Sequence, residues 1–171
     1  GAGLFALITI FGPASGAHMN PVVTLLFALR REIPPARALT YIAAQIIGGI
    51  AGTLLTHAMF DLPLIQTATQ ARTGFPLWLG EATATFGLIL AILGAINARA
   101  NVAAIVATYI TAAYWFTSST SFANPAVTLA RSLTSTATSI RPADVLGYCT
   151  AETIGALLAA LIGSWLFRPE T

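Results

Sequence analysis

Charged side chains are scarce in this sequence. Only 8% of the 171 residues are charged, lysine is absent, and eight arginines against six acidic residues give a net charge of +2. Soluble domains contain about 25% charged residues, so the composition excludes an ordinary soluble domain and favours an integral membrane protein. A positive charge this small and scattered gives no indication of a nucleic-acid partner.

The residue types that carry catalysis and metal binding are also few. The single cysteine, Cys149, cannot form an internal disulfide, and its apolar surroundings indicate a small core residue. The two histidines, His18 and His57, do not have the HExxH spacing of a zinc site. The two aspartates lie near predicted helix ends, and no glycine-rich phosphate loop occurs. We therefore expect no enzyme, no metal site and no cofactor.

Long apolar runs are abundant instead. Hydrophobic residues make up 56% of the chain, and the mean hydropathy is +0.79. A helix of about 20 apolar residues crosses a bilayer, and we expect four stretches to meet that length: residues 37–60, 75–97, 102–119 and 143–167. The shorter run 1–14 is expected to be the second half of a spanning helix whose beginning is missing. These runs predict an all-α, multi-pass membrane protein.

Two Asn-Pro dipeptides occur in matching contexts. Asn20-Pro21 opens the apolar run 21–29, Asn124-Pro125 opens the run 125–133, and the pattern Asn-Pro-x-Val-Thr-Leu recurs in both. At 1.5 Å per residue each run would span about 13 Å, near half of the hydrocarbon layer. We therefore predict two half-helices.

The repeat extends beyond the dipeptides. Residues 41–48 align with residues 148–155, in the same order relative to the half-helices. Duplications of this kind often give two repeats of inverted topology in membrane transport proteins. We predict one channel domain over 1–171, in which 1–60 ends the first repeat with a half-helix at 21–30, and 75–167 is the second repeat with a half-helix at 125–133.

Asparagine followed by proline suits the start of a helix. The asparagine oxygen accepts a backbone N–H of the first turn, and proline fits the first helical position. The side-chain NH₂ groups of Asn20 and Asn124 would remain free to donate. Two such helices meeting at mid-membrane would bring donors and two positive dipole ends together. Non-helical backbone at that depth needs protein or a water-filled cavity around it, which predicts a narrow polar path that excludes protons and cations.

These residues resemble the major intrinsic protein family, the aquaporins and aquaglyceroporins. Residues 15–24 look like its first signature, with Val22 in place of the usual alanine after Pro21, and residues 122–126, ending in Pro125-Ala126, look like the second. The resemblance implies six spanning helices, two half-helices and a homotetramer in the bilayer, here in a bacterial inner membrane. Compared with that pattern, the first helix and the start of the second are missing from this sequence.

The resemblance also places a selectivity filter. The family normally has arginine directly after the second Asn-Pro-Ala, where this chain has Val127, and spacing puts Ser121 and Ala112 at two further filter positions. The fourth position falls before residue 1. The uncharged filter resembles that of a bacterial branch associated with arsenic resistance. It implies a channel for glycerol-like polyols, urea and undissociated metalloid hydroxides such as arsenous acid (arsenite), or for water. Arg131, one helical turn later, is expected to face away from the constriction.

Four polar residues are expected to support the pore loops: His18, Gln45, Glu81 and Glu152. For His18 a pH gate is the alternative, and for the two carboxylates the alternative is proton relay. A relay would suit a coupled secondary transporter, which is the first rival to a channel. The second rival is a non-conducting structural or degenerate fragment.

Overall fold

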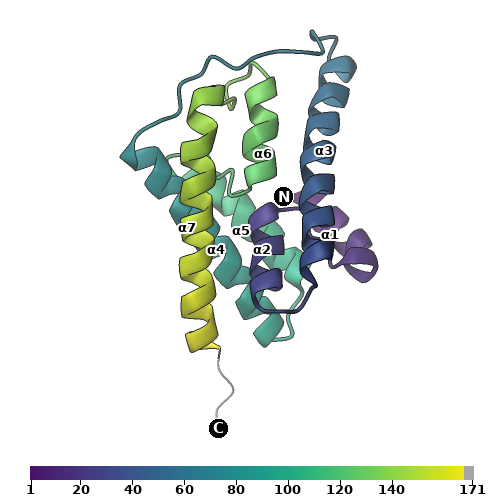
Figure 1. The fold of residues 1–171 in the computed structure, drawn as a ribbon, viewed down its shortest axis with the longest axis vertical. Helices are drawn as coiled ribbons and strands as arrows, with labels where there is room; N and C mark the ends of the chain where they lie inside the picture. The colour runs from purple at the N-terminus through teal and green to yellow at the C-terminus, as the bar shows by residue number, and fades with distance from the viewer. Residues whose placement is uncertain (168–171) are drawn as a thin grey trace.

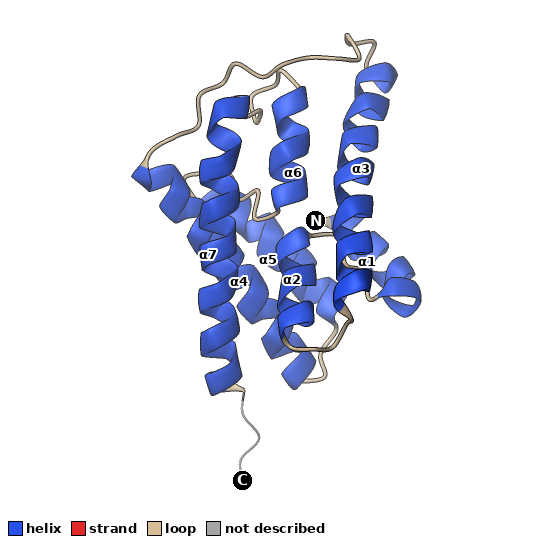
Figure 2. Ribbon diagram, viewed as in Figure 1, coloured by secondary structure: helices blue, strands red, loops and turns tan. Residues whose placement is uncertain are grey.

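The computed structural model describes residues 1–167, and every regular element among them is helical (Figure 1, Figure 2). Three helices are long and apolar enough to cross a membrane: α3 (Pro35–Met59), α4 (Phe75–Asn97) and α7 (Val145–Leu166). A short 3₁₀ turn, η2 (Pro142–Asp144), leads into α7. The predicted spans 37–60, 75–97 and 143–167 match these helices closely.

The third predicted span, residues 102–119, is wrong in length. The run 102–119 forms α5 (Val102–Phe116), a helix of only 15 residues, or about 22 Å. Its start is capped by the side chain of Asn101, which accepts the N–H of Ala104 at 3.1 Å. It ends early because Thr117 is extended, with φ −99° and ψ 144°, and begins the loop toward Asn124. The other short apolar helix is α1 (Ala2–Ser15).

Two shorter helices follow the Asn-Pro dipeptides. They are α2 (Pro21–Leu29) and α6 (Pro125–Ala130), and the 3₁₀ turn η1 (Arg131–Leu133) extends α6 to the predicted end of its run. In Figure 1, α6 stands above α2 with the starting ends of the two helices facing each other. This end-to-end arrangement positions the candidate site.

The α4 helix is the centre of the packing, with α7 and α5 against it. One core cluster joins Ile89 and Leu93 of α4 to Ala156 and Ala159 of α7, together with side chains of α2. The closest approach is at Gly155, where a Cβ atom would lie 2.2 Å from the carbonyl oxygen of Ala82. Small residues of this kind let two helix backbones meet, which is how helices associate inside a bilayer.

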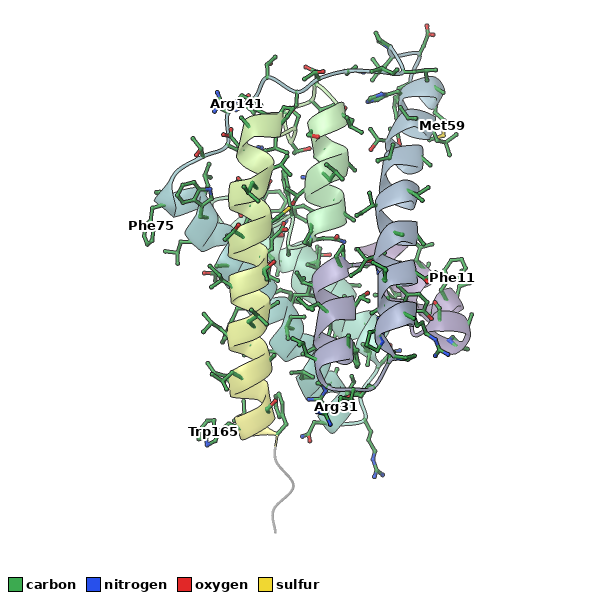
Figure 3. All side chains as sticks on the ribbon, in the orientation of Figure 1. Phe11, Arg31, Met59, Phe75, Arg141 and Trp165 are labelled. Atoms are coloured by element: carbon green, nitrogen blue, oxygen red, sulfur yellow. The ribbon has the colours of Figure 1, made fainter. Side chains whose placement is uncertain are left out.

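The outer surface is largely apolar. Ala38 and His57 are the buried residues of α3, and apolar side chains such as Leu39, Ile47 and Met59 are exposed. Lipid tails solvate such a surface as well as a protein core does. Figure 3 shows Arg31 and Arg141 at opposite ends of the molecule, while Phe11 and Phe75 lie at its sides. The distribution fits a protein that crosses a bilayer along its long axis.

The long connection from α3 to α4 crosses one end of the molecule (Figure 1). Arg72 fixes it there: its backbone N–H donates to Asp144 Oδ2 at 2.8 Å, and its guanidinium donates to the carbonyl oxygens of Ser139 (2.8 Å) and Ala137 (2.9 Å). Arg141 also forms an ion pair with Asp144. Hydrogen bonds and an ion pair of these two arginines thus hold the loops together at this end of the structure.

Candidate functional site: the junction of the two short helices

Each short helix is capped by the asparagine before it. Asn20 Oδ1 accepts the N–H of Val22 at 3.1 Å, and Asn124 Oδ1 accepts the N–H of Ala126 at 3.0 Å. Pro21 and Pro125 occupy the first helical positions. The capping expected from the dipeptides is present in both helices.

The two asparagine amides also tie the helix ends to each other. Asn20 Nδ2 donates to the carbonyl oxygen of Ala123 at 2.6 Å, and Asn124 Nδ2 donates to the carbonyl oxygen of Met19 at 2.9 Å. The NH₂ groups were expected to be free to donate, and each donates once to the opposite loop. An amide NH₂ has two hydrogens, so each asparagine keeps one further donor.

The loops before the asparagines share one backbone turn. Gly16 and Ala17 have φ values of 74° and 50°, and Thr120 and Ser121, at the same distances before Asn124, have φ values of 65° and 43°. Residues other than glycine rarely adopt this left-handed region, and they do so where the surroundings hold them. The repeat in the sequence is thus also a repeat in backbone conformation.

Buried polar side chains hold the second loop. Glu81 Oε1 accepts the N–H of Phe122 at 2.9 Å, and Glu81 Oε2 accepts the N–H of Ala123 at 2.7 Å. Glu152 Oε1 accepts the N–H of Asn124 at 3.1 Å and the hydroxyl of Thr128 at 2.6 Å. Both carboxylates are fully buried, so these bonds form in surroundings of low dielectric constant, where they are strong.

Gln45 holds the first loop in the equivalent way. Its Nε2 donates to the carbonyl oxygen of His18 at 2.6 Å and to Thr24 Oγ1 at 2.8 Å. Thr24 and Thr128 follow their asparagines by the same four residues, and both are fully buried. Sequence reasoning missed these two threonines, although both belong to the repeated Asn-Pro-x-Val-Thr-Leu pattern.

His18 packs rather than bonds through its ring. Its ring centroid lies 4.9 Å from that of Phe27 and 5.5 Å from that of Tyr41. Nδ1 is buried and has no hydrogen-bond partner within the described chain. The ring therefore supports the first loop by contact with α2 and α3.

Two cavities meet at the junction. The first, here the α3/α6 cavity, has a volume of about 1040 Å³ and is lined mainly by α3, α6 and the loop after η1. The second, here the α2/α5 cavity, has a volume of about 800 Å³, includes both Asn20 and Asn124, and is lined mainly by α1, α2, α4 and α5. Three residues line both cavities: His18, Met19 and Val127. We call these three residues the neck.

The predicted filter residues are only partly together. Val127 and Ser121 both line the α2/α5 cavity, and Ser121 Oγ is buried there without a partner among residues 1–167. Ala112 lies elsewhere, in a separate groove between α1 and α5 beside Trp115. The side of α5 that reaches the cavity carries Ile110 and Tyr114, so helical periodicity turns Ala112 away from the neck.

The remaining signature residues divide between packing and lining. Pro21 and Val22 are buried, and Val22 belongs to the core cluster with α4 and α7. Ala126 lines the α3/α6 cavity. Pro125 is half-buried and lines neither cavity within the described residues.

Arg131, which was expected to face away from the constriction, lines one of the two cavities. It lines the α3/α6 cavity together with Val127, and its Cζ atom lies 4.2 Å from the ring centroid of Phe122. The helical turn of η1 carries the side chain back over the loop and not toward the protein exterior. No group of three or more His, Cys, Asp or Glu residues that could hold a metal ion occurs between residues 1 and 167.

Comparison with known proteins gives consistent matches. The family description Major intrinsic protein matches residues 1–115. The chain is 51% identical over 170 residues to Aquaglyceroporin AqpS of Rhizobium meliloti, covering 99% of this chain and 73% of that protein. It is 31% identical over 176 residues to Aquaporin NIP2-1 of Zea mays, covering 96% of this chain and 56% of the relative. The lens fiber major intrinsic protein of Canis lupus familiaris is 31% identical over 107 residues.

Proposed function

This chain belongs to the Major intrinsic protein family, and from that premise we propose that it is a passive transmembrane channel for small uncharged solutes. The membrane character rests on the three long apolar helices and on the family. The proposed path runs from the α3/α6 cavity through the neck into the α2/α5 cavity.

The observation that carries this proposal is the reciprocal pair of asparagine bonds at the place where the two cavities meet. Each short helix begins there, so two helix N-termini turn their partial positive charges toward one point. Each asparagine retains a donor for a passing oxygen. Donors and positive ends without a matching acceptor repel cations and interrupt a chain of proton-carrying waters.

We place the junction at mid-membrane and the two repeats in inverted orientation. The shared backbone turn and the paired supports Gln45–Thr24 and Glu152–Thr128 favour two copies of one unit. Residues 1–60 and 75–167 are the proposed repeats of one channel domain. A homotetramer is the proposed assembly, as the family resemblance implies. Cross-linking of the full-length protein in membranes should give a ladder that ends at four subunits.

The proposed solute class follows from two predicted filter residues without formal charge, Val127 in the neck and Ser121 in the α2/α5 cavity. Val127 and Ser121 are small and bring no formal charge to the constriction, where a filter arginine would narrow it and favour water. One relative is described as an aquaglyceroporin. We therefore propose glycerol-like polyols, urea and undissociated metalloid hydroxides such as arsenous acid as permeants, with water as a co-permeant.

Stopped-flow light scattering on proteoliposomes of the full-length protein tests the proposal. We expect wild-type protein to raise the permeability to glycerol, urea and water above that of empty liposomes. Val127→Arg should reduce glycerol and urea flux more than water flux, because a long cationic side chain narrows the neck. Val127→Met controls for added bulk without charge. Equal loss of all fluxes, or no change, would count against an uncharged filter at Val127.

A coupled secondary transporter is the second candidate, favoured by the two fully buried carboxylates Glu81 and Glu152. Their oxygens already accept backbone N–H groups of the second loop, which favours a structural role. Saturation of glycerol flux and its dependence on a proton gradient would identify a transporter, and linear, gradient-independent flux would identify a channel.

A further inference from the structure

Arg131 stands at the entrance to the neck. It lies four residues after Val127, and residues i and i+4 share one face of a helical segment. Both residues line the α3/α6 cavity. A solute that moves from this cavity toward the neck therefore passes the guanidinium group before it reaches Val127.

Two arginines lie over the same Phe122 ring, but only one is held by carbonyl oxygens. Arg72 Cζ is 5.5 Å from the ring centroid, and its guanidinium donates to Ser139, Ala137 and Ser119 carbonyl oxygens at 2.8, 2.9 and 3.2 Å. Arg131 Cζ is closer to the ring, at 4.2 Å. Its Nη1 is enclosed and has no hydrogen-bond acceptor within residues 1–167.

Arg72 and Arg131 therefore have different roles. All three guanidinium nitrogens of Arg72 donate to protein oxygens, so that side chain fixes loops. Arg131 is positioned by stacking on Phe122 and by a side-chain hydrogen bond to Tyr114, while the Nη1 donor of its planar, permanently charged group stays unmatched. Buried donors without protein partners are the exception in folded proteins and point to water or a ligand.

The surroundings of Arg131 suit an oxygen-bearing neutral solute. Among the described residues that line the α3/α6 cavity there is no acidic side chain, and the acidic group that interacts with the guanidinium, Glu81, lies outside that cavity. Thr134, Thr136 and Thr138 line the same cavity, and a threonine hydroxyl can both donate and accept; that of Thr134 bonds to His57 Nε2 at 2.9 Å. The cavity thus offers one strong donor group and several weaker adaptable ones, next to an apolar neck.

We propose that Arg131 is a specificity-determining residue that donates hydrogen bonds to the hydroxyl oxygens of polyols and of undissociated oxyacids at the entrance to the neck. The inference rests on the proposed channel function and deepens it. In this arrangement the cationic donor lies one helical turn outside the constriction, where it selects for oxygen-rich solutes without narrowing the path at Val127.

A purely structural arginine predicts a different outcome. If Arg131 only supports the loop through Phe122, its removal lowers water and glycerol flux together and lowers the thermal stability of the protein. If it selects solutes, its removal lowers the ratio of glycerol flux to water flux. The flux ratio is therefore the readout that distinguishes the two roles.

The test uses full-length protein in proteoliposomes, with glycerol, urea and water fluxes measured on each preparation. Arg131→Met keeps a long apolar side chain over Phe122 and removes the donors, and we expect it to lower the glycerol-to-water ratio by about tenfold, the effect of losing one hydrogen bond to a charged group. Arg131→Lys should restore part of the ratio. Arg37→Met, which removes an exposed charge from a residue that lines neither cavity, should leave the ratio unchanged.

The flux measurements distinguish failure of the Arg131 inference from failure of the proposed channel function. A lowered ratio in Arg131→Met, with recovery in Arg131→Lys, supports the inference. An unchanged ratio in a conducting, normally stable Arg131→Met protein overturns it and leaves the channel function standing. Wild-type liposomes no more permeable than empty ones overturn the channel function and this inference with it.

Discussion

The Glu81 carboxylate is fully buried and uses both of its oxygens, one for the N–H of Phe122 and the other for the N–H of Ala123. In Glu81→Gln one oxygen becomes an NH₂ group, and that group faces a backbone donor. One of the two buried backbone N–H groups then has no acceptor, and the other donates to a neutral amide oxygen instead of a charged carboxylate. We therefore predict that Glu81→Gln loosens the loop that precedes Asn124.

The magnitude follows from the bonds that are lost. A hydrogen bond to a charged group contributes about 1.5–3 kcal/mol, and a buried donor left unpaired costs about 1–3 kcal/mol. Because these contributions overlap, we expect Glu81→Gln to lower the free energy of unfolding by about 2–4 kcal/mol. A loss of this size is large against the whole stability of a domain.

Glu152→Gln is the matched control. Glu152 uses only Oε1, for the N–H of Asn124 and the hydroxyl of Thr128, and its Oε2 has no partner among residues 1–167. Glutamine can keep the accepting oxygen in place and put its NH₂ where Oε2 lies. Any negative charge on Glu152 would repel the Glu81 carboxylate, and the substitution removes that repulsion. We expect a change within about 1 kcal/mol, or a small gain in stability.

Thermal unfolding of the full-length protein in nanodiscs provides the assay, with glycerol flux measured in parallel. At about 2–4 °C per kcal/mol for a chain of this size, Glu81→Gln should lower the midpoint by roughly 5–15 °C and reduce flux, while Glu152→Gln should do neither. Equal effects of the two substitutions, or a larger effect of Glu152→Gln, would refute the view that Glu81 is the main support of the second loop.

Two further predictions concern helix packing and the junction. Gly155→Ala would bring a Cβ atom to 2.2 Å from the carbonyl oxygen of Ala82. We expect the free energy of unfolding to fall by about 3 kcal/mol or more. Thermal unfolding measures this loss, and Gly52→Ala, whose added Cβ meets nothing within 4 Å, is the control. Asn20→Asp keeps a capping oxygen but turns the donor to the Ala123 carbonyl oxygen into an acceptor. Solute flux should fall at least about tenfold for the loss of this buried bond, and wild-type flux would contradict the role assigned to the asparagine pair.

Much of the helical framework could be predicted because it depends on local patterns. The bounds of α2 and α4 follow from Asn20-Pro21 and from the apolar run that begins at Phe75, and both helices have those bounds. The length of α5 was wrong because an apolar composition continues past Phe116 while the backbone turns away at Thr117. Composition describes the solvent a segment prefers, and it does not fix where the chain leaves the helix.

The site was less accessible to sequence reasoning. The repeated Asn-Pro dipeptides drew attention to Asn20 and Asn124, but the sequence did not show that their amides donate to the opposite loop. Spacing placed Ala112 at the filter, but in the packed helices it lines a separate groove between α1 and α5. Arg131, which was expected to face away from the constriction, lines the α3/α6 cavity one helical turn outside it. These outcomes depend on the rotation of α5 and on contacts of the Phe122 ring, which connect residues far apart in the chain.

The sequence by itself determined that this protein is a membrane-embedded helical repeat with two asparagine-capped short helices, because hydropathy, capping and proline act over a few neighbouring residues. Only the tertiary structure decided which polar groups remain available to a solute. Each donor is either satisfied or left open by a partner that lies a hundred or so residues away, as the Asn20–Ala123 and Asn124–Met19 bonds show, and that pairing exists only once the helices are packed.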